Sequence, residues 1–135
     1  MVLMEEKTTS SSAKKTLQIS LPYFLHPSDR PGAIITTCML NGDNYDMWEK
    51  AMTNALRAKN KLGFIDGSLK KPDLDTLEAS LWIACNSMLI SWIFNSIENS
   101  IQPSITYEET VKAVWDDLRE CFSIGNAPRI HELKG

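Results

Sequence analysis

One uncharged stretch, from Ala79 to Ile97, constrains the fold of this chain more than any other feature. About twenty consecutive apolar residues suffice for a helix that crosses a bilayer, so a membrane span is the first alternative to weigh. A polar stripe near the helical period also runs through the stretch and consists of Ser80, Ser87, Ser91 and Asn95. Such a stripe favours a central helix that neighbouring helices surround. Asp75 and Glu78 form a capping box for this helix, which is predicted to end near Asn99.

An amphipathic helix is predicted earlier in the chain, from Tyr45 to about Lys61. Its apolar stripe repeats at intervals of three and four residues and consists of Tyr45, Trp48, Met52, Ala55, Leu56 and Lys59. Asn44 is the expected N-cap, because its side-chain oxygen can accept a free backbone N–H. Gly63 is the expected stop of the helix, because glycine adopts the left-handed conformation without a steric cost.

A third helix is predicted from about residue 107 to residue 123, with a capping box made by Thr106 and Glu109. Its expected inward face consists of Val111, Val114, Trp115, Leu118, Cys121 and Phe122. Its outer face carries Glu109, Lys112, Asp116 and Arg119, at spacings that predict ion pairs. Gly125 is expected to end this helix, and a partial fourth helix is expected from Asn126 to the last residue.

The first 40 residues lack helical periodicity. Residues 1–20 include a polar stretch of low complexity, and we expect this segment to be a disordered tail. Residues 21–40 contain three prolines, which predict an extended arm, and their β-branched run favours a short strand from Ile34 to Leu40. Residues 41–135 form the helical domain. The predicted fold is therefore all-α, a small bundle of three long helices and a partial fourth.

The cysteines and the other reactive side chains do not form a pattern that predicts chemistry. Cys38, Cys85 and Cys121 are widely spaced, and no Cys-x-x-Cys pair or Cys/His cluster accompanies them. We predict no catalytic, cofactor-binding or metal-binding residue and no small-molecule substrate. Because no secretory signal is recognisable, we expect an intracellular protein, cytoplasmic rather than nuclear.

A group of basic side chains is the candidate contact for RNA and consists of Arg57, Lys59, Lys61, Lys70 and Lys71. Lysine and arginine neutralise phosphates, so these residues would contact the RNA backbone. Cations near the end of a helix are also explained by the helix dipole alone, and this alternative stays open. Since the formal net charge of the chain is −3, any affinity for RNA is expected to be weak and not specific for sequence.

Several blocks of sequence resemble the N-terminal, capsid-like Gag segment of plant copia-type LTR retrotransposon polyproteins. These blocks are Pro22 to Asp29, Leu40 to Trp48, Ala55 to Gly67, Val114 to Ser123 and Gly125 to His131. The resemblance covers about residues 22–135 and implies a helical domain that helps to build a particle around the RNA of an element. The residues expected to carry the fold and this likeness are Leu40, Gly42, Asn44, Tyr45, Trp48, Leu56, Gly63, Trp82, Trp92, Trp115, Phe122 and Gly125.

The chain also departs from the family pattern, because it has no zinc knuckle and no Asp-Ser/Thr-Gly protease motif. It is therefore expected to be a domain truncated at its C-terminal end. The resemblance implies a structural module that associates with itself or with another protein, not an enzyme and not a membrane protein. The alternative is a domesticated adaptor that binds a peptide or a protein, in which the arm lies in or vacates a groove between the first two helices.

Overall fold

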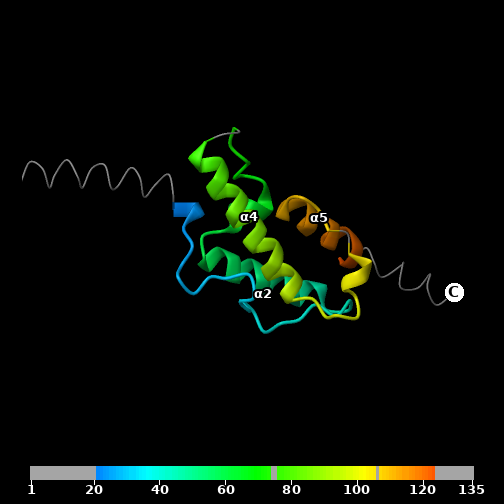
Figure 1. The fold of residues 1–135 in the computed structure, drawn as a ribbon. Helices are drawn as coiled ribbons and strands as arrows, with labels where there is room; N and C mark the ends of the chain where they lie inside the picture. Colours follow the sequence, from blue (N-terminus) through cyan, green and yellow to red (C-terminus); the bar gives the residue numbers. More distant parts are fainter. Residues whose placement is uncertain (1–20, 74–75, 106, 124–135) are drawn as a thin grey trace, which may run out of the picture.

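Three long α-helices form the framework of the protein: α2 (Tyr45–Ala58), α4 (Leu77–Asn95) and α5 (Val111–Phe122). A short helix, α3 (Leu62–Asp66), follows α2, and two 3₁₀ turns, η1 (Leu21–Tyr23) and η2 (Gln102–Ser104), lie in the connections. The computed structural model describes residues 21–73, 76–105 and 107–123 (Figure 1). No strand occurs in these ranges, so the all-α prediction is confirmed. The predicted tail and the predicted fourth helix lie outside the described residues.

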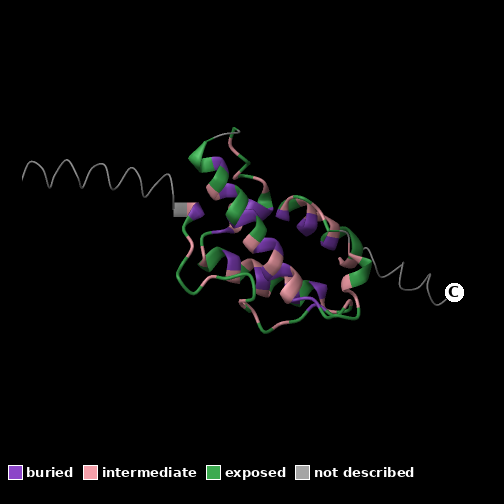
Figure 2. Cartoon of the chain, in the orientation of Figure 1, coloured by how far each residue is buried: buried purple, intermediate pink, exposed green. Residues whose placement is uncertain are grey.

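The core lies where α4 meets the other helices, and α4 runs through the middle of the molecule (Figure 1). All four tryptophans are buried, and three of them take part in aromatic pairs that join one helix to another. Trp48 and Trp115 join α2 to α5, with their ring centroids 5.3 Å apart. Phe64 and Trp82 join α3 to α4 at 5.8 Å. The buried residues face this interior from every helix (Figure 2), which confirms Tyr45, Trp48, Leu56, Trp82, Trp92 and Trp115 as core residues.

The end of α2 differs from the prediction. The helix ends at Ala58, and Asn60, not Gly63, adopts the left-handed conformation, with a φ of 60°. The backbone N–H of Lys61 donates to the Leu56 carbonyl at 2.8 Å, and that of Asn60 donates to the Arg57 carbonyl at 3.0 Å. These two bonds form a Schellman motif at the end of the helix. Asparagine tolerates the left-handed conformation that this motif requires.

Gly63 instead lies inside α3, where the chain passes close to it. A Cβ atom at this position would lie 3.1 Å from the Leu69 Cβ and from the Ser68 Oγ. The Leu69 N–H also donates to the Gly63 carbonyl at 3.0 Å. The prediction that this glycine stops the first helix is therefore wrong, and its small size serves the close packing of the next loop.

The N-caps of the two later helices are not the residues that the predicted capping boxes named. Thr76 is the N-cap of α4, and its hydroxyl accepts the Ala79 N–H at 3.0 Å. Thr110 is the N-cap of α5, and its hydroxyl accepts the Ala113 N–H at 3.2 Å. The predicted caps Asp75 and Thr106 lie at positions outside the described residues. In both helices a threonine nearer the first buried turn satisfies the free backbone donor.

Two predictions about single residues and one about a strand are also corrected. Asn44 precedes α2 but makes no side-chain cap bond. Its amide instead accepts the Asn41 N–H at 3.0 Å and donates to the Met39 carbonyl at 2.8 Å, which fixes the turn before the helix. Cys121 is exposed and does not belong to the inward face of α5. The predicted strand is reduced to one isolated parallel bridge between Leu40 and Ile97.

The arm of residues 21–40 is a packed part of the fold. Tyr23 is buried against Phe64, at a ring distance of 6.2 Å. The Trp92 indole N–H donates to the Arg30 carbonyl at 2.9 Å, and Asn95 donates to the Pro31 carbonyl at 2.6 Å. Two residues of the polar-stripe region of α4 thus hold the arm, which explains part of the polarity of this helix.

Helix α4 is, within the described residues, the one helix that is long and apolar enough to cross a membrane by length and composition. A buried core helix satisfies the same criterion, and eight residues of α4 are buried in this fold. Its coverage is incomplete, since Ile83 is 45% exposed and Leu77 is 76% exposed. The central position predicted for this helix is therefore confirmed, with one of its faces uncovered.

Candidate functional site

The structure separates the five candidate RNA contacts, and Lys61 is lost as a candidate. Its side chain is buried, with 1% exposed. The ammonium group donates to the Phe24 carbonyl at 2.6 Å and to the Lys59 carbonyl at 3.2 Å. Burial lowers the pKa of Lys61 below its ordinary value. The prediction of an RNA contact at this residue is therefore wrong, because Lys61 anchors the arm from inside the fold.

The side chain of Lys59 also binds the arm. Its ammonium group forms an ion pair with Asp29 at 2.6 Å and lies 5.2 Å from the ring centroid of Trp92. Arg57 is exposed in the last turn of α2, where a cation complements the helix dipole. Of the five basic residues, only Lys70 and Lys71 remain exposed in the loop between α3 and α4.

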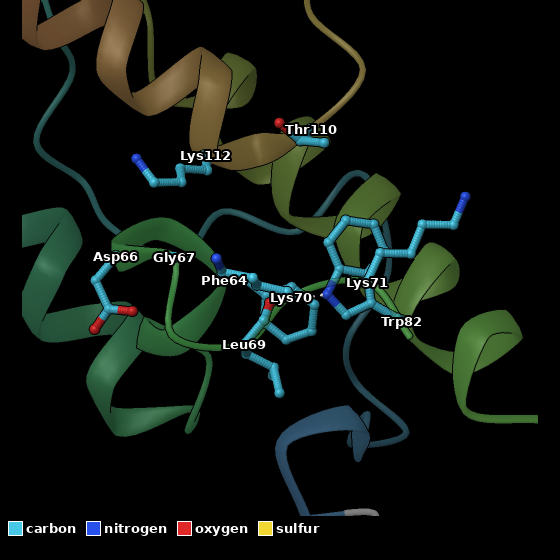
Figure 3. A pocket seen from close by; sticks show the side chains of 9 residues that line it. All are labelled: Phe64, Asp66, Gly67, Leu69, Lys70, Lys71, Trp82, Thr110 and Lys112. Atoms are coloured by element: carbon cyan, nitrogen blue, oxygen red, sulfur yellow. Dashed lines mark hydrogen bonds between the residues drawn. The ribbon is translucent and has the colours of Figure 1, made fainter. Parts of the chain in front are cut away.

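These two lysines lie at the rim of a pocket of about 510 Å³ between α3, α4 and α5. Its apolar wall is formed by Phe64, Leu69 and Trp82, which come from α3, the following loop and α4. Lys112, in the first turn of α5, lies across the opening from the loop (Figure 3). The pocket therefore combines an apolar interior with a cationic rim.

The loop that carries the two lysines is held by local bonds. Gly67 ends α3 with a φ of 84°, and the Ser68 N–H donates to the Asp66 carboxylate at 2.8 Å. One residue further on, the Leu69 carbonyl accepts the Trp82 indole N–H at 3.0 Å. The pocket wall and the lysine loop are thus fixed to α3 and α4.

Gly67 also leaves space for the side chain of Lys112, the third lysine at the pocket. The aliphatic stem of Lys112 passes directly over this glycine, and a Cβ atom there would lie 2.7 Å from the Lys112 Cε. Lys112 then forms an ion pair with Asp116 at 2.6 Å, as its spacing on the outer face of α5 predicts. Hydrogen bonds from Ser68, together with the charge of Lys112, lower the pKa of Asp66.

The chemistry of the pocket follows from this arrangement. Within the described residues, Lys70 and Lys71 make no hydrogen bond or ion pair, so their ammonium groups are available to a ligand. A partner with an apolar surface and negative charge matches this site, because it would cover the apolar wall and neutralise the rim. No group of His, Cys, Asp or Glu side chains in the part of the chain that the structure describes could hold a metal ion.

The remaining residues of the predicted fold signature take structural places. Leu40 is fully buried, and Gly42 adopts a φ of 98° in the turn before α2. Phe122 is half-buried against the core, and Gly125 lies outside the described residues. The sequence indicated Lys70 and Lys71 but did not indicate that Lys112 joins them. That residue is some forty positions away along the chain, and no periodicity links it to the loop.

One family of known proteins matches part of this chain. The sequence profile of the family described as Gag-polypeptide of LTR copia-type matches residues 26–73. This segment of the chain is therefore similar to a copia-type Gag-polypeptide domain. The match to this Gag family extends from the arm through α2 and α3 to the lysine loop, so it includes one side of the pocket.

Two curated plant proteins from Arabidopsis thaliana are distantly similar to this chain. The Retrovirus-related Pol polyprotein from transposon RE2 is 23% identical over 104 residues, and its counterpart from transposon RE1 is 21% identical over 104 residues. Each alignment covers 70% of this chain and 7% of the relative. The chain therefore spans only a small part of the length of these polyproteins. No solved structure matches it significantly.

Proposed function

We propose that this Gag domain is a structural, non-catalytic module that associates with itself inside the cell. The observation that carries the proposal is the lysine-rimmed pocket, which leaves an apolar wall open and two ammonium groups that pair with no described residue. The fold does not need these two charges, because neither ammonium group forms a hydrogen bond or an ion pair with another described residue. An open apolar wall beside unpaired charges is typical of a surface that binds another macromolecule.

The test is the mass of the protein in solution. Light scattering on the full chain, from micromolar to near-millimolar concentration, is expected to show a mass that increases with concentration. The same series with a non-specific single-stranded RNA at low salt measures the contribution of RNA. A protein that stays monomeric over the whole range, with and without RNA, would contradict self-association.

A weak contact with RNA through Lys70 and Lys71 is the second part of the proposal. Two lysines that neutralise two phosphates of a single strand would give a log–log slope of affinity against salt of about −1.4. Replacing both lysines with glutamine is expected to remove this salt dependence. A slope that the double replacement leaves unchanged would place the RNA contact elsewhere on the domain.

The adaptor alternative requires the arm of residues 21–40 to leave its place. The contacts of this arm oppose its release, since it contributes a buried tyrosine and receives hydrogen bonds from Lys61, Trp92 and Asn95. Deleting residues 1–39 discriminates between the two proposals. We expect a large loss of stability and the binding of an apolar dye. If the shortened domain keeps its stability and gains affinity for peptides, the adaptor function is favoured.

A further inference from the structure

A second hollow lies on the other side of α5 and has the opposite charge to the lysine-rimmed pocket. Its volume is about 250 Å³, and it is lined by Ser104, Ile105, Glu108, Asp117, Leu118, Glu120 and Cys121. Three of these residues are acidic, and none is basic. Ile105 and Leu118 contribute apolar surface. We call this site the acidic hollow.

Two carboxyl groups meet in the acidic hollow. Glu108 and Asp117 both line this hollow, and the proximity of Asp117 raises the pKa of Glu108 above its ordinary value. When both groups are ionised they repel each other, because like charges at short distance are unfavourable. An ammonium group placed between them would relieve that repulsion.

The acidic hollow and the lysine-rimmed pocket share no residue, and they lie on different faces of one helix. Lys112 borders the pocket, whereas Asp117 borders the hollow five positions later. Five positions correspond to a rotation of about 140° and a rise of about 7.5 Å on an α-helix. The lysine loop of one molecule therefore faces away from its own acidic hollow.

We propose that two copies of this chain associate head to tail, with Lys70 and Lys71 of one copy in the acidic hollow of the next. This inference rests on the proposed self-association and names the two surfaces that carry it. Charge complementarity selects the occupant, because the rim supplies ammonium groups that pair with no described residue and the hollow supplies the carboxylates of Glu108 and Asp117. The stems of the lysines would cover the apolar surface of Ile105, while the incoming copy would cover the open wall of the pocket.

Such an interface is heterologous, since each copy contributes a different surface. A heterologous contact leaves one pocket and one hollow unused at the ends of every assembly, so the assembly grows into a ring or a filament. The wild-type chain is therefore expected to exceed a dimer at high concentration. A contact between two identical surfaces would stop at the dimer.

The test uses two variants of the full chain that each remove one of the two surfaces. The pocket variant carries Lys70→Gln and Lys71→Gln, and the hollow variant carries Glu108→Gln and Asp117→Asn. Each variant alone is expected to self-associate at least about tenfold more weakly than the wild type in analytical ultracentrifugation. A 1:1 mixture is expected to form a dimer and nothing larger, because only one intact pocket and one intact hollow remain for each pair.

Matched controls separate this contact from a general effect of charge. Lys50→Gln with Arg57→Gln changes the net charge as the pocket variant does, but at exposed positions on α2, and it should associate like the wild type. Thermal melting followed by circular dichroism verifies that every variant is folded. If both site variants associate like the wild type, or if the mixture of folded variants forms no dimer, the head-to-tail contact is refuted while self-association stands. If the wild type is monomeric, the proposed function itself fails.

Discussion

Replacing Trp115 with alanine is expected to lower the free energy of unfolding by about 3–5 kcal/mol. Trp115 is 2% exposed, and its ring lies 5.3 Å from that of Trp48 across the contact between α5 and α2. Trp48 is fully buried, and its indole N–H donates to the Ser96 hydroxyl at 3.0 Å. Because this hydrogen bond holds Trp48 in place, its ring cannot move freely into the space that the substitution leaves.

The expected loss has two contributions. Most of it comes from the lost burial of the indole and from the cavity that remains. The contact between the two rings adds about 0.5–1.5 kcal/mol. Trp115→Phe keeps an aromatic ring beside Trp48 and should therefore cost less than Trp115→Ala. Since a domain of this kind has a stability of about 5–15 kcal/mol, the alanine variant should lose a large share of it.

Urea unfolding followed by far-ultraviolet circular dichroism measures this effect, because the other tryptophans complicate a fluorescence signal. Phe24→Ala is the control, since this aromatic side chain is 58% exposed and its removal should change the stability by no more than about 0.5 kcal/mol. A loss below about 1 kcal/mol for Trp115→Ala, with an unchanged m-value, would refute the assignment of this residue to the core.

Three further substitutions test the arm, a helix cap and the pocket. Burial alone would raise the pKa of Asp29, but the hydrogen bonds from Lys59 and from the His26 backbone, together with the charges of Lys59 and Lys61, outweigh it and lower the pKa below the ordinary 3.8. The Lys59–Asp29 pair therefore stabilises the fold fully above pH 3.8 and ceases to do so as the pH falls through the lower pKa of the folded state. Asp29→Asn should therefore make the melting temperature depend less on pH on the acid side. An unchanged dependence of the melting temperature on pH would contradict this. Thr110→Ala should lower the free energy of unfolding in urea by about 1 kcal/mol, and Thr110→Ser should keep most of the stability. Equal losses in the two variants would contradict a capping role of the hydroxyl. Gly67→Ala should cost about 1–2 kcal/mol through its left-handed backbone alone, and adding Lys112→Ala should relieve only the steric part; full recovery in the double variant would rule out backbone strain.

The folding unit is longer than the segment that matches the Gag family. The match ends at residue 73, yet the buried aromatic residues within it pack against partners beyond it. Trp48 packs against Trp115, and Phe64 packs against Trp82. The arm at the start of the segment is likewise held by α4, through Trp92 and Asn95. Helices α4 and α5 are therefore required to close the core of the matched segment.

The three long helices follow from local chemistry, whereas their ends were misplaced and the short helix α3 was not predicted. Apolar spacing identified α2, and the uncharged stretch identified α4. The caps were harder to place because several residues compete for each one. Thr76 and Thr110 cap the helices where Asp75 and Thr106 were expected, and Asn60 replaced Gly63 as the left-handed residue. Such choices depend on which turn the tertiary contacts bury.

The candidate site shows the opposite relation between sequence and structure. The sequence placed five basic residues within a short segment, but it did not reveal which of them are buried, paired or exposed. Lys61 is buried under the arm and Lys59 pairs with Asp29, whereas Lys70 and Lys71 stay exposed. Burial and pairing of a lysine depend on residues distant in the sequence, so spacing alone carries no information about them.

By itself, the sequence determined the all-α class, the buried tryptophans and the Gag resemblance, because helical periodicity and residue type are local properties. Only the tertiary structure decided which charges remain available. It placed Lys112 beside the lysine loop, and it separated this pocket from the acidic hollow at Glu108 and Asp117. The physical reason is that electrostatic and apolar surfaces form where distant segments meet, and that meeting is set by the packing of α3, α4 and α5.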